Sequence, residues 1–261
     1  PEINIKRKNL EIPEELKLTR DKILPVFFKE MDFSSEKLIL ETPLIYSIEP
    51  ALEKYFKTVA IYDINPGLIK KAASVTGKSE LEEDGSNLPI VLKNILNNRK
   101  KERQLTNILK DILPFITKID VENYSDKSLL FTLKESYNQN GFIPVSLISD
   151  GTINITALIV ALYFEEKRTA IIEEPERNIH PYLISKVVDM INDASRLKQI
   201  VITTHNPEMV KYVQLEDLYL VHRNEKGFSS IIKPVEKKEV EVFLNNDMGI
   251  DDLYIQNLLE V

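Results

Sequence analysis

Two adjacent glutamates, Glu173 and Glu174, follow an apolar run in the stretch TAIIEEPERNIHP at residues 169–181. A buried parallel strand that ends in carboxylates places them at the carboxyl edge of its sheet, where open α/β proteins bind ligands. One carboxylate can hold Mg²⁺ through water, and its neighbour can orient or deprotonate a water that attacks a phosphate. Two glutamates alone are also typical of a solvated strand end, so other residues must decide.

Two further segments carry residues that suit phosphate chemistry. Ser149, Gly151 and Thr152 lie in the segment SDGT, directly before an apolar stretch with helical spacing. A helix N-terminus with free N–H groups, a hydroxyl and a glycine can bind phosphate. His205 ends the segment QIVITTH, and a histidine after a buried strand can donate to a terminal phosphate. Taken singly, these features are typical of a helix cap and an ordinary surface histidine.

The hydrophobic pattern predicts the elements that must position these residues. In the second half of the chain, strands that are apolar on both faces alternate with helices. This alternation predicts an α/β fold with a mostly parallel sheet flanked by helices. The elements are a helix over 153–164, a strand over 170–172, a helix over 181–194, a strand over 199–203 and a short helix opened by Asn206-Pro207.

The remainder of the chain mixes helical and strand signals. We expect a mixed region over residues 1–140, with a helical insert at about 87–116, and a second region over 141–261 that carries the chemical motifs. The predicted elements outside the motif region are a helix and then a strand in 49–64, a turn at 65–67, a helix break near Asn97-Asn98, three strands in 117–149, a hairpin in 215–234 and short C-terminal helices.

The three motifs follow a specific order: SDGT before a helix, IEEPE with HP after it, and TTH after a second strand. This order resembles the C-terminal half of an ABC-type ATPase head, and more narrowly the AAA-like predicted ATPases with ABC motifs, relatives of RecF, SMC and OLD-family proteins. The stretch LEEDGSNLPIVLKNIL at residues 81–96 is similar to one that those ATPases carry before their helical region. The resemblance covers about residues 59–234 and implies a P-loop NTPase fold of the ABC-ATPase type. It also implies ATP hydrolysis and nucleotide-dependent dimerisation, in the service of DNA repair or phage defence.

The resemblance also implies a role for each motif residue, with ATP and Mg²⁺ as cofactors. Glu173 matches the Walker B acid that binds Mg²⁺, Glu174 the catalytic glutamate, and His205 the switch histidine. The other motif residues are implied to act across a homodimer: Ser149, Gly151 and Thr152 match the signature that contacts ATP on the opposite protomer, Asp150 replaces the glycine of transporters, and Asn178 and His180 lie in the D-loop at the dimer interface.

A phosphate-binding Walker A loop requires the pattern G-x-x-x-x-G-K-[ST] after a strand and before a helix. The sequence holds one Gly-Lys-Ser, at Gly77-Lys78-Ser79, but Ala72 stands where the first glycine belongs. We therefore interpret TGKS as a loop and predict that the N-terminal part of the fold, with the Walker A loop, is missing. This chain alone is then expected to bind ATP weakly and to hydrolyse little. Three explanations are open: the sequence is a fragment of a longer protein, which its start at Pro1 favours, a separate polypeptide carries the loop, or the protein is a natural variant that has lost nucleotide binding.

Composition limits the partners and the setting of the protein. Its 261 residues carry a net charge of -7, which does not favour nucleic acid, so DNA enters as a partner through the resemblance alone. The chain has no cysteine and no apolar stretch long enough to cross a bilayer, so we expect a cytoplasmic protein that does not act at a membrane.

Two other functions fit the same residues. The chain could be a binding or regulatory module that keeps the ATPase fold, does not hydrolyse ATP and binds a partner protein. The glutamates could also serve a metal nuclease of the Toprim type, but this requires a D-x-D motif, and the sequence has only the adjacent pair Asp251-Asp252.

Overall fold

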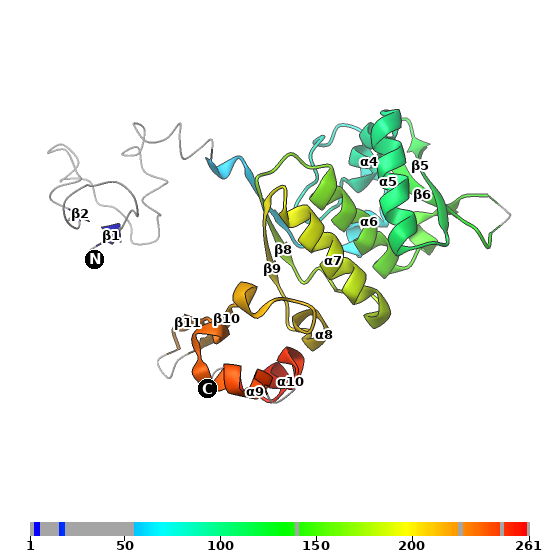
Figure 1. Cartoon of the computed structure of the whole chain (residues 1–261). Helices are drawn as coiled ribbons and strands as arrows, with labels where there is room; N and C mark the ends of the chain where they lie inside the picture. The colour runs from blue at the N-terminus through cyan, green and yellow to red at the C-terminus, as the bar shows by residue number, and fades with distance from the viewer. Residues whose placement is uncertain are drawn as a thin grey trace, which may run out of the picture. The chain divides into compact units, whose positions relative to one another are not determined.

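The computed structural model divides the chain into two units, residues 1–56 and residues 57–261 (Figure 1). In the first unit the described residues include two short antiparallel strands, β1 (Ile3–Ile5) and β2 (Leu16–Leu18). Beyond these strands, the structure describes residues 55–138, 141–223, 227–245 and 248–259. Most of the helix predicted in 49–64 lies outside the described residues.

A parallel three-stranded sheet forms the centre of the second unit. Strand β8 (Thr169–Glu173) lies between β3 (Val59–Tyr62) and β9 (Gln199–Thr203), and both pairings are parallel. All three strands therefore end at the same edge of the sheet. The strands predicted from the apolar runs at 59–62, 170–172 and 199–203 are confirmed.

Two long helices cover one face of this sheet (Figure 1). They are α6 (Asp150–Tyr163) and α7 (Ile184–Ser195), the latter preceded by the 3-10 turn η5 (Pro181–Leu183). Beneath them, Ala170 and Ile172 are fully buried. The parallel sheet flanked by helices is thus confirmed, as are the predicted helices at 153–164 and 181–194.

The opposite face of the sheet is open among the described residues. Ile61, Ile171 and Val201 stand in register across the three strands, so their side chains form one apolar row. Ile61 is 47% exposed and Val201 is 44% exposed, whereas the alternate residues of both strands pack on the core. The prediction that the strands are apolar on both faces is correct, but in the described ranges helices cover only one of them.

A second layer packs against α6. It contains α4 (Leu88–Leu96), α5 (Arg99–Ile112) and an antiparallel sheet in which β6 (Ser128–Glu135) pairs with β4 (Ala73–Ser74), β5 (Ile116–Ser125) and β7 (Ile143–Pro144). The helix break is confirmed: the Asn98 side chain caps α5 by accepting from the Lys100 and Lys101 amides at 3.1 and 3.2 Å. One hydrophobic cluster includes residues from both sides of position 140, and the domain boundary at 140 stays a prediction.

Two local predictions are wrong. The third strand expected before residue 149 is only the two-residue β7, because Pro144 has no amide hydrogen to extend the ladder and the 3-10 turn η4 (Val145–Leu147) follows. The turn expected at 65–67 is the start of a one-turn helix, α3 (Pro66–Ile69), in which the Asn65 side chain accepts from the Gly67 amide at 3.0 Å.

The C-terminal part follows the predicted pattern of a hairpin and short helices. Strands β10 and β11 pair antiparallel, and the turn between them lies partly outside the described residues. The elements are α8 (Pro207–Val210), η6 (Leu215–Asp217), β10 (Leu220–Arg223), β11 (Ser229–Ile232), η7 (Pro234–Glu236), α9 (Lys238–Asn245) and α10 (Ile250–Ile255). Among the residues that the structure describes, no helix has the length and apolar character to cross a membrane.

A buried carboxyl group, Glu165, gives the fold a pH dependence. Its Oε1 accepts from the Leu81 amide at 2.9 Å, and burial raises its pKa. A raised pKa means that the folded chain binds this proton more tightly than the unfolded chain, so stability is highest below the unfolded pKa and falls as pH rises. We expect Glu165→Gln, which keeps the acceptor, to raise Tm by roughly a few degrees at pH 7. The gain should shrink toward pH 4 in calorimetric scans, and a gain that is independent of pH would contradict this account.

Candidate functional site

The carboxyl edge of the parallel sheet brings together acidic and polar side chains from three strand ends. Asp63 follows β3, Glu173 ends β8, Glu174 comes directly after it, and His205 follows β9. Glu173 is in register with Thr203, and the Glu174 amide donates to the Thr203 carbonyl at 2.9 Å. The glutamates and the switch segment, which the sequence placed on two separate strands, are therefore neighbours in the sheet.

The turn that follows β8 has a strained backbone. Glu174 has φ of 41° and Asn178 has φ of 62°, both in the left-handed region that side-chain-bearing residues rarely occupy. Asparagine tolerates this region, but a glutamate there costs on the order of 1–3 kcal/mol and persists where its surroundings fix it. Here the Arg177 amide donates to the Glu174 carbonyl at 2.9 Å, and the Ile179 amide donates to the Glu176 carbonyl at 3.0 Å. The backbone conformation of the turn thus fixes the position of Glu174.

An arginine of this turn joins the ends of β3 and β8. The Arg177 guanidinium donates from Nε to Glu174 Oε2 at 3.1 Å and from Nη1 to Asp63 Oδ1 at 2.7 Å. These hydrogen bonds raise the pKa of Arg177 further. Asp63 and Arg177 were missed from sequence, although Asp63 follows an apolar strand in the same way as Glu173 and could have been found by the same rule.

The predicted signature segment forms the start of α6. The Ser149 side chain caps the helix: Oγ accepts from the Thr152 amide at 3.2 Å and donates to Thr152 Oγ1 at 2.8 Å. Asp150 pairs with Lys70 at 2.5 Å. A Cβ atom on Gly151 would lie 2.5 Å from the Asn178 carbonyl oxygen, so the helix start lies directly against the turn after β8. The structure therefore brings the predicted signature and D-loop residues together within one chain.

Two buried polar side chains, which sequence reasoning missed, fasten the same turn. On α6, Asn154 Nδ2 donates to the Arg177 carbonyl, and beyond β9, Thr204 Oγ1 donates to Glu176 Oε1. The remaining polar atom of each anchoring side chain, Asn154 Oδ1 and Glu176 Oε2, is buried and lacks a hydrogen-bond partner among the described residues. The turn is thus joined to the signature helix on one side and to the switch segment on the other.

The two predicted histidines differ in their surroundings. His180 Nδ1 accepts from the Tyr182 amide at 3.2 Å and so caps the 3-10 turn η5. His205 is exposed at the sheet edge, as are Glu173 and Asn178. His205 is therefore accessible to a ligand at this edge. His180 already makes a contact within its own chain, and its predicted role at a dimer interface must be compatible with that contact.

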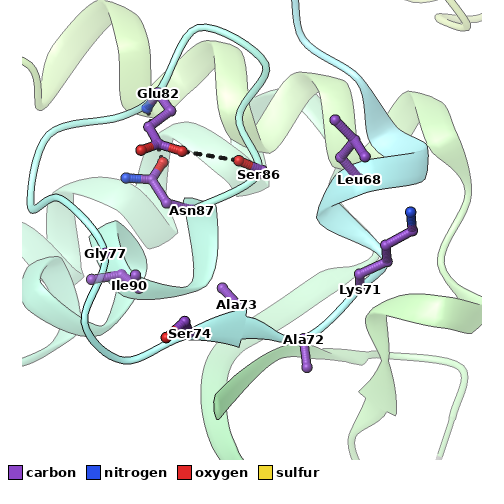
Figure 2. A pocket seen from close by; sticks show the side chains of 10 residues that line it. All are labelled: Leu68, Lys71, Ala72, Ala73, Ser74, Gly77, Glu82, Ser86, Asn87 and Ile90. Carbon is purple, nitrogen blue, oxygen red and sulfur yellow. Dashed lines mark hydrogen bonds between the residues drawn. The ribbon is translucent and has the colours of Figure 1, made fainter. Parts of the chain in front are cut away.

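The TGKS segment does not have the surroundings of a phosphate loop. It lies in the loop between β4 and α4, and that helix begins only at Leu88. The loop borders a pocket of about 300 Å³ that Gly77, Glu82, Ser86 and Asn87 help to line (Figure 2). Asn87 Nδ2 donates to the Lys78 and Glu80 carbonyls at 3.0 and 2.7 Å, so the loop turns carbonyl groups toward this side chain. A phosphate loop presents amides instead.

The carboxyl edge of the sheet offers a Mg²⁺ ion part of its coordination shell. Among the described residues, no three histidine, aspartate or glutamate side chains converge into a metal site. Mg²⁺ in phosphate-transfer sites usually takes one or two carboxylates, and phosphate oxygens and waters complete its shell. The exposed carboxylate of Glu173 meets that requirement.

A parallel sheet flanked by helices, with acids at its carboxyl edge, defines an α/β fold of the class that binds ligands at this edge. The chain belongs to the AAA domain family described as putative AbiEii toxin, Type IV TA system, whose model matches residues 13–211. This confirms the predicted resemblance to AAA-type ATPases. No curated protein matches the sequence.

Several solved structures of SMC ATPase heads are similar to this chain. One, from work on ATP-driven dimerization and DNA-stimulated activation of SMC ATPases, is 15% identical, with coverage of 57% of this chain and 92% of that one and a TM-score of 0.44. A second, the Pyrococcus furiosus Smc head bound to the C-terminal domain of ScpA, is 15% identical, with coverage of 62% and 44% and a TM-score of 0.43. A third, an Smc head bound to the C-winged helix domain of ScpA, is 16% identical, with coverage of 67% and 55% and a TM-score of 0.45.

Proposed function

We propose that the carboxyl edge of the parallel sheet is half of an ATP-hydrolysing site of the ABC type. The observation that carries the proposal is the meeting of Glu173, Glu174 and His205 at one edge, with Glu174 on a strained turn. Glu173 would hold Mg²⁺, which neutralises charge on the phosphates. Glu174 would orient the attacking water and accept its proton, and the exposed His205 would donate to the terminal phosphate oxygen.

We further propose that the start of α6 serves the nucleotide of an opposite protomer. Ser149, Gly151 and Thr152 would contact its phosphate, and Asn178 and His180 would cross the dimer interface. The close approach of Gly151 to the Asn178 carbonyl supports this assignment, because the two predicted trans segments form one continuous surface. ATP-dependent homodimerisation follows as part of the proposal.

The phosphate grip would come from another segment, in cis or in a partner chain. The sequence contains no G-x-x-x-x-G-K-[ST] pattern, and TGKS lies in a loop far ahead of the next helix. The row of Ile61, Ile171 and Val201, in which Ile61 and Val201 are exposed and Ile171 is half-buried, offers an apolar face for such an element. The family description favours a toxin–antitoxin setting for the ATPase over DNA repair, and we propose no DNA contact from the charge distribution.

The proposal predicts a result for the TGKS lysine. Lys78→Ala should leave Mg-ATP binding unchanged in titration calorimetry, and the 261-residue chain should bind ATP weakly and hydrolyse little without a phosphate loop. Because Asn87 holds the loop through backbone carbonyls, the variant should also keep the Tm of the parent. Tight ATP binding that Lys78→Ala abolishes would mean that TGKS does grip phosphate and that the site is complete in this chain.

A second candidate function is a module that keeps the fold but does not hydrolyse ATP, and binds a partner protein instead. The pairing of Glu174 with Arg177 favours it, because this carboxylate already has a cationic partner. Adding a chain or segment with a Walker A loop distinguishes the two functions. Hydrolysis that appears on addition and depends on Glu174 supports the ATPase, whereas ATP-independent binding of the added chain without hydrolysis supports the binding module.

A further inference from the structure

Arg177 bridges two carboxylates that are far apart in sequence. Asp63 follows β3 and Glu174 follows β8, and the guanidinium contacts both, at 2.7 and 3.1 Å. The fork of an arginine suits this geometry, since Nε and Nη1 can serve two acceptors at once. Three side chains thus form one charged network at the edge where we place nucleotide chemistry.

The network is too accessible to be explained as a stabilising element. The side chains of Arg177, Asp63 and Glu174 are 39%, 46% and 37% exposed. Ion pairs with this exposure contribute about 0–1 kcal/mol to folding, and a competing ion can replace them. The turn has buried anchors as well, in Asn154 and Glu176. Arg177 is therefore free to exchange partners without loss of the turn.

The strand order shows toward which side of β8 the network lies. In the sheet, β3 lies on one side of β8 and β9 lies on the other. Arg177 connects Glu174 to Asp63, on the β3 side, whereas His205 follows β9 on the opposite side. The arginine therefore holds the Glu174 carboxylate toward β3 and away from the switch histidine.

We propose that Arg177 is a positioning residue that withholds Glu174 from catalysis while the site lacks nucleotide, and that a divalent cation and Arg177 compete for the same edge. The inference rests on the proposed hydrolytic role of Glu174. Release of Glu174 does not leave the guanidinium of Arg177 without an ionic partner, because its ion pair with Asp63 remains. Binding of a divalent cation would thus release the Glu174 carboxylate from Arg177, and the free carboxylate could then accept a hydrogen bond from water.

Mn²⁺ binding to the 261-residue chain without nucleotide tests the competition directly. Free Mn²⁺ is measured by electron paramagnetic resonance for the parent, Arg177→Gln, Arg177→Lys and the control Arg196→Gln, whose residue ends α7 at the amino end of β9. In Arg177→Gln the Glu174 carboxylate loses its cationic partner and becomes available to the ion, so Mn²⁺ binding should tighten about tenfold. Arg177→Lys keeps the charge and should stay near the parent, as should Arg196→Gln.

Two further variants locate the effect. Adding Glu174→Gln to Arg177→Gln should remove the gain, and Asp63→Asn should give none, because it leaves Arg177 with Glu174 as its sole carboxylate partner in the network. Equal Mn²⁺ affinity in Arg177→Gln and the parent would overturn the inference, as would a gain that survives Glu174→Gln. Thermal unfolding of every variant verifies the fold, and Arg177→Met, which also removes the charge, replaces Arg177→Gln if the glutamine variant unfolds.

Hydrolysis, measured separately with the phosphate loop supplied, distinguishes the inference from the proposed function. Arg177→Gln should raise basal hydrolysis several-fold. A tenfold Mn²⁺ gain with no hydrolysis in any variant would refute the proposed function and leave the charge competition standing. Hydrolysis that depends on Glu174, with no change in Mn²⁺ affinity on loss of Arg177, would support the ATPase and refute the role given to Arg177.

Discussion

Glu174→Gln is expected to lower ATP turnover by about 10²- to 10⁴-fold in an assembly with a phosphate loop, and to leave ATP affinity within a few-fold of the parent. Glutamine keeps the size and the hydrogen-bonding oxygen of glutamate but cannot accept the proton of the attacking water. The strained φ of 41° at this residue supports a role that needs a fixed direction. Steady-state phosphate release and equilibrium ATP binding together separate the chemical step from binding.

The matched control for this substitution is Glu122→Gln, an exposed residue of β5 in the antiparallel sheet. It changes the same charge at a distance from the parallel sheet edge and should leave turnover unchanged. Glu173→Gln should differ from both, because loss of the carboxylate that we assign to Mg²⁺ should weaken Mg-ATP binding as well as turnover. If Glu174→Gln turns over as fast as Glu122→Gln, Glu174 is not the catalytic base.

The parts of the site that sequence predicted are those carried by local patterns. The apolar runs before Glu173 and His205 define buried strands, and the SDGT segment has the composition of a helix start, so β8, β9 and α6 follow from a few residues each. The adjacency of β8 and β9 required one further rule, that consecutive parallel strands joined by a helix tend to be neighbours.

The network around the turn after β8 could not be predicted in this way. Arg177 and Asp63 are 114 positions apart, and Glu176 and Thr204 are 28 apart, so their contacts depend on the order of strands in the sheet. That order placed β3, the first strand of the unit, beside β8. Hydrophobic periodicity gives no information on such pairings. The acid after β3 was visible in the sequence, but its partner was not.

Periodicity also could not indicate how the second face of the sheet is covered. Ile61 and Val201 belong to strands that are apolar on both faces, and such strands predict a sheet covered on both sides. In the described residues that face is open. The alternation of apolar residues in 142–149 predicted a strand that is longer than the one observed. The reason is simpler, since Pro144 and the cap at Ser149 stop a strand that the apolar residues would otherwise favour.

Gly151 is the residue at which folding and function should fail together. It is the second residue of α6, where alanine would ordinarily stabilise a helix by up to about 1 kcal/mol. A Cβ there would lie 2.5 Å from the Asn178 carbonyl oxygen and 3.6 Å from the Ile179 Cα, both backbone atoms. Because hydrogen bonds of the Arg177 and Ile179 amides hold the backbone on either side of Asn178, the helix and the turn must separate for alanine to fit.

We therefore expect Gly151→Ala to lower the free energy of unfolding by about 1–3 kcal/mol, the range for an added group in a packed contact. Chemical denaturation measures this against Gly67→Ala, a helical glycine whose Cβ would meet only the Asn65 side chain, at 3.1 Å. Hydrogen exchange should become faster in residues 174–180, and turnover in a complete assembly should fall with it, since Arg177 and Glu174 lie on the displaced turn. A more stable Gly151→Ala variant would show that helix propensity outweighs the contact and that α6 does not hold this turn.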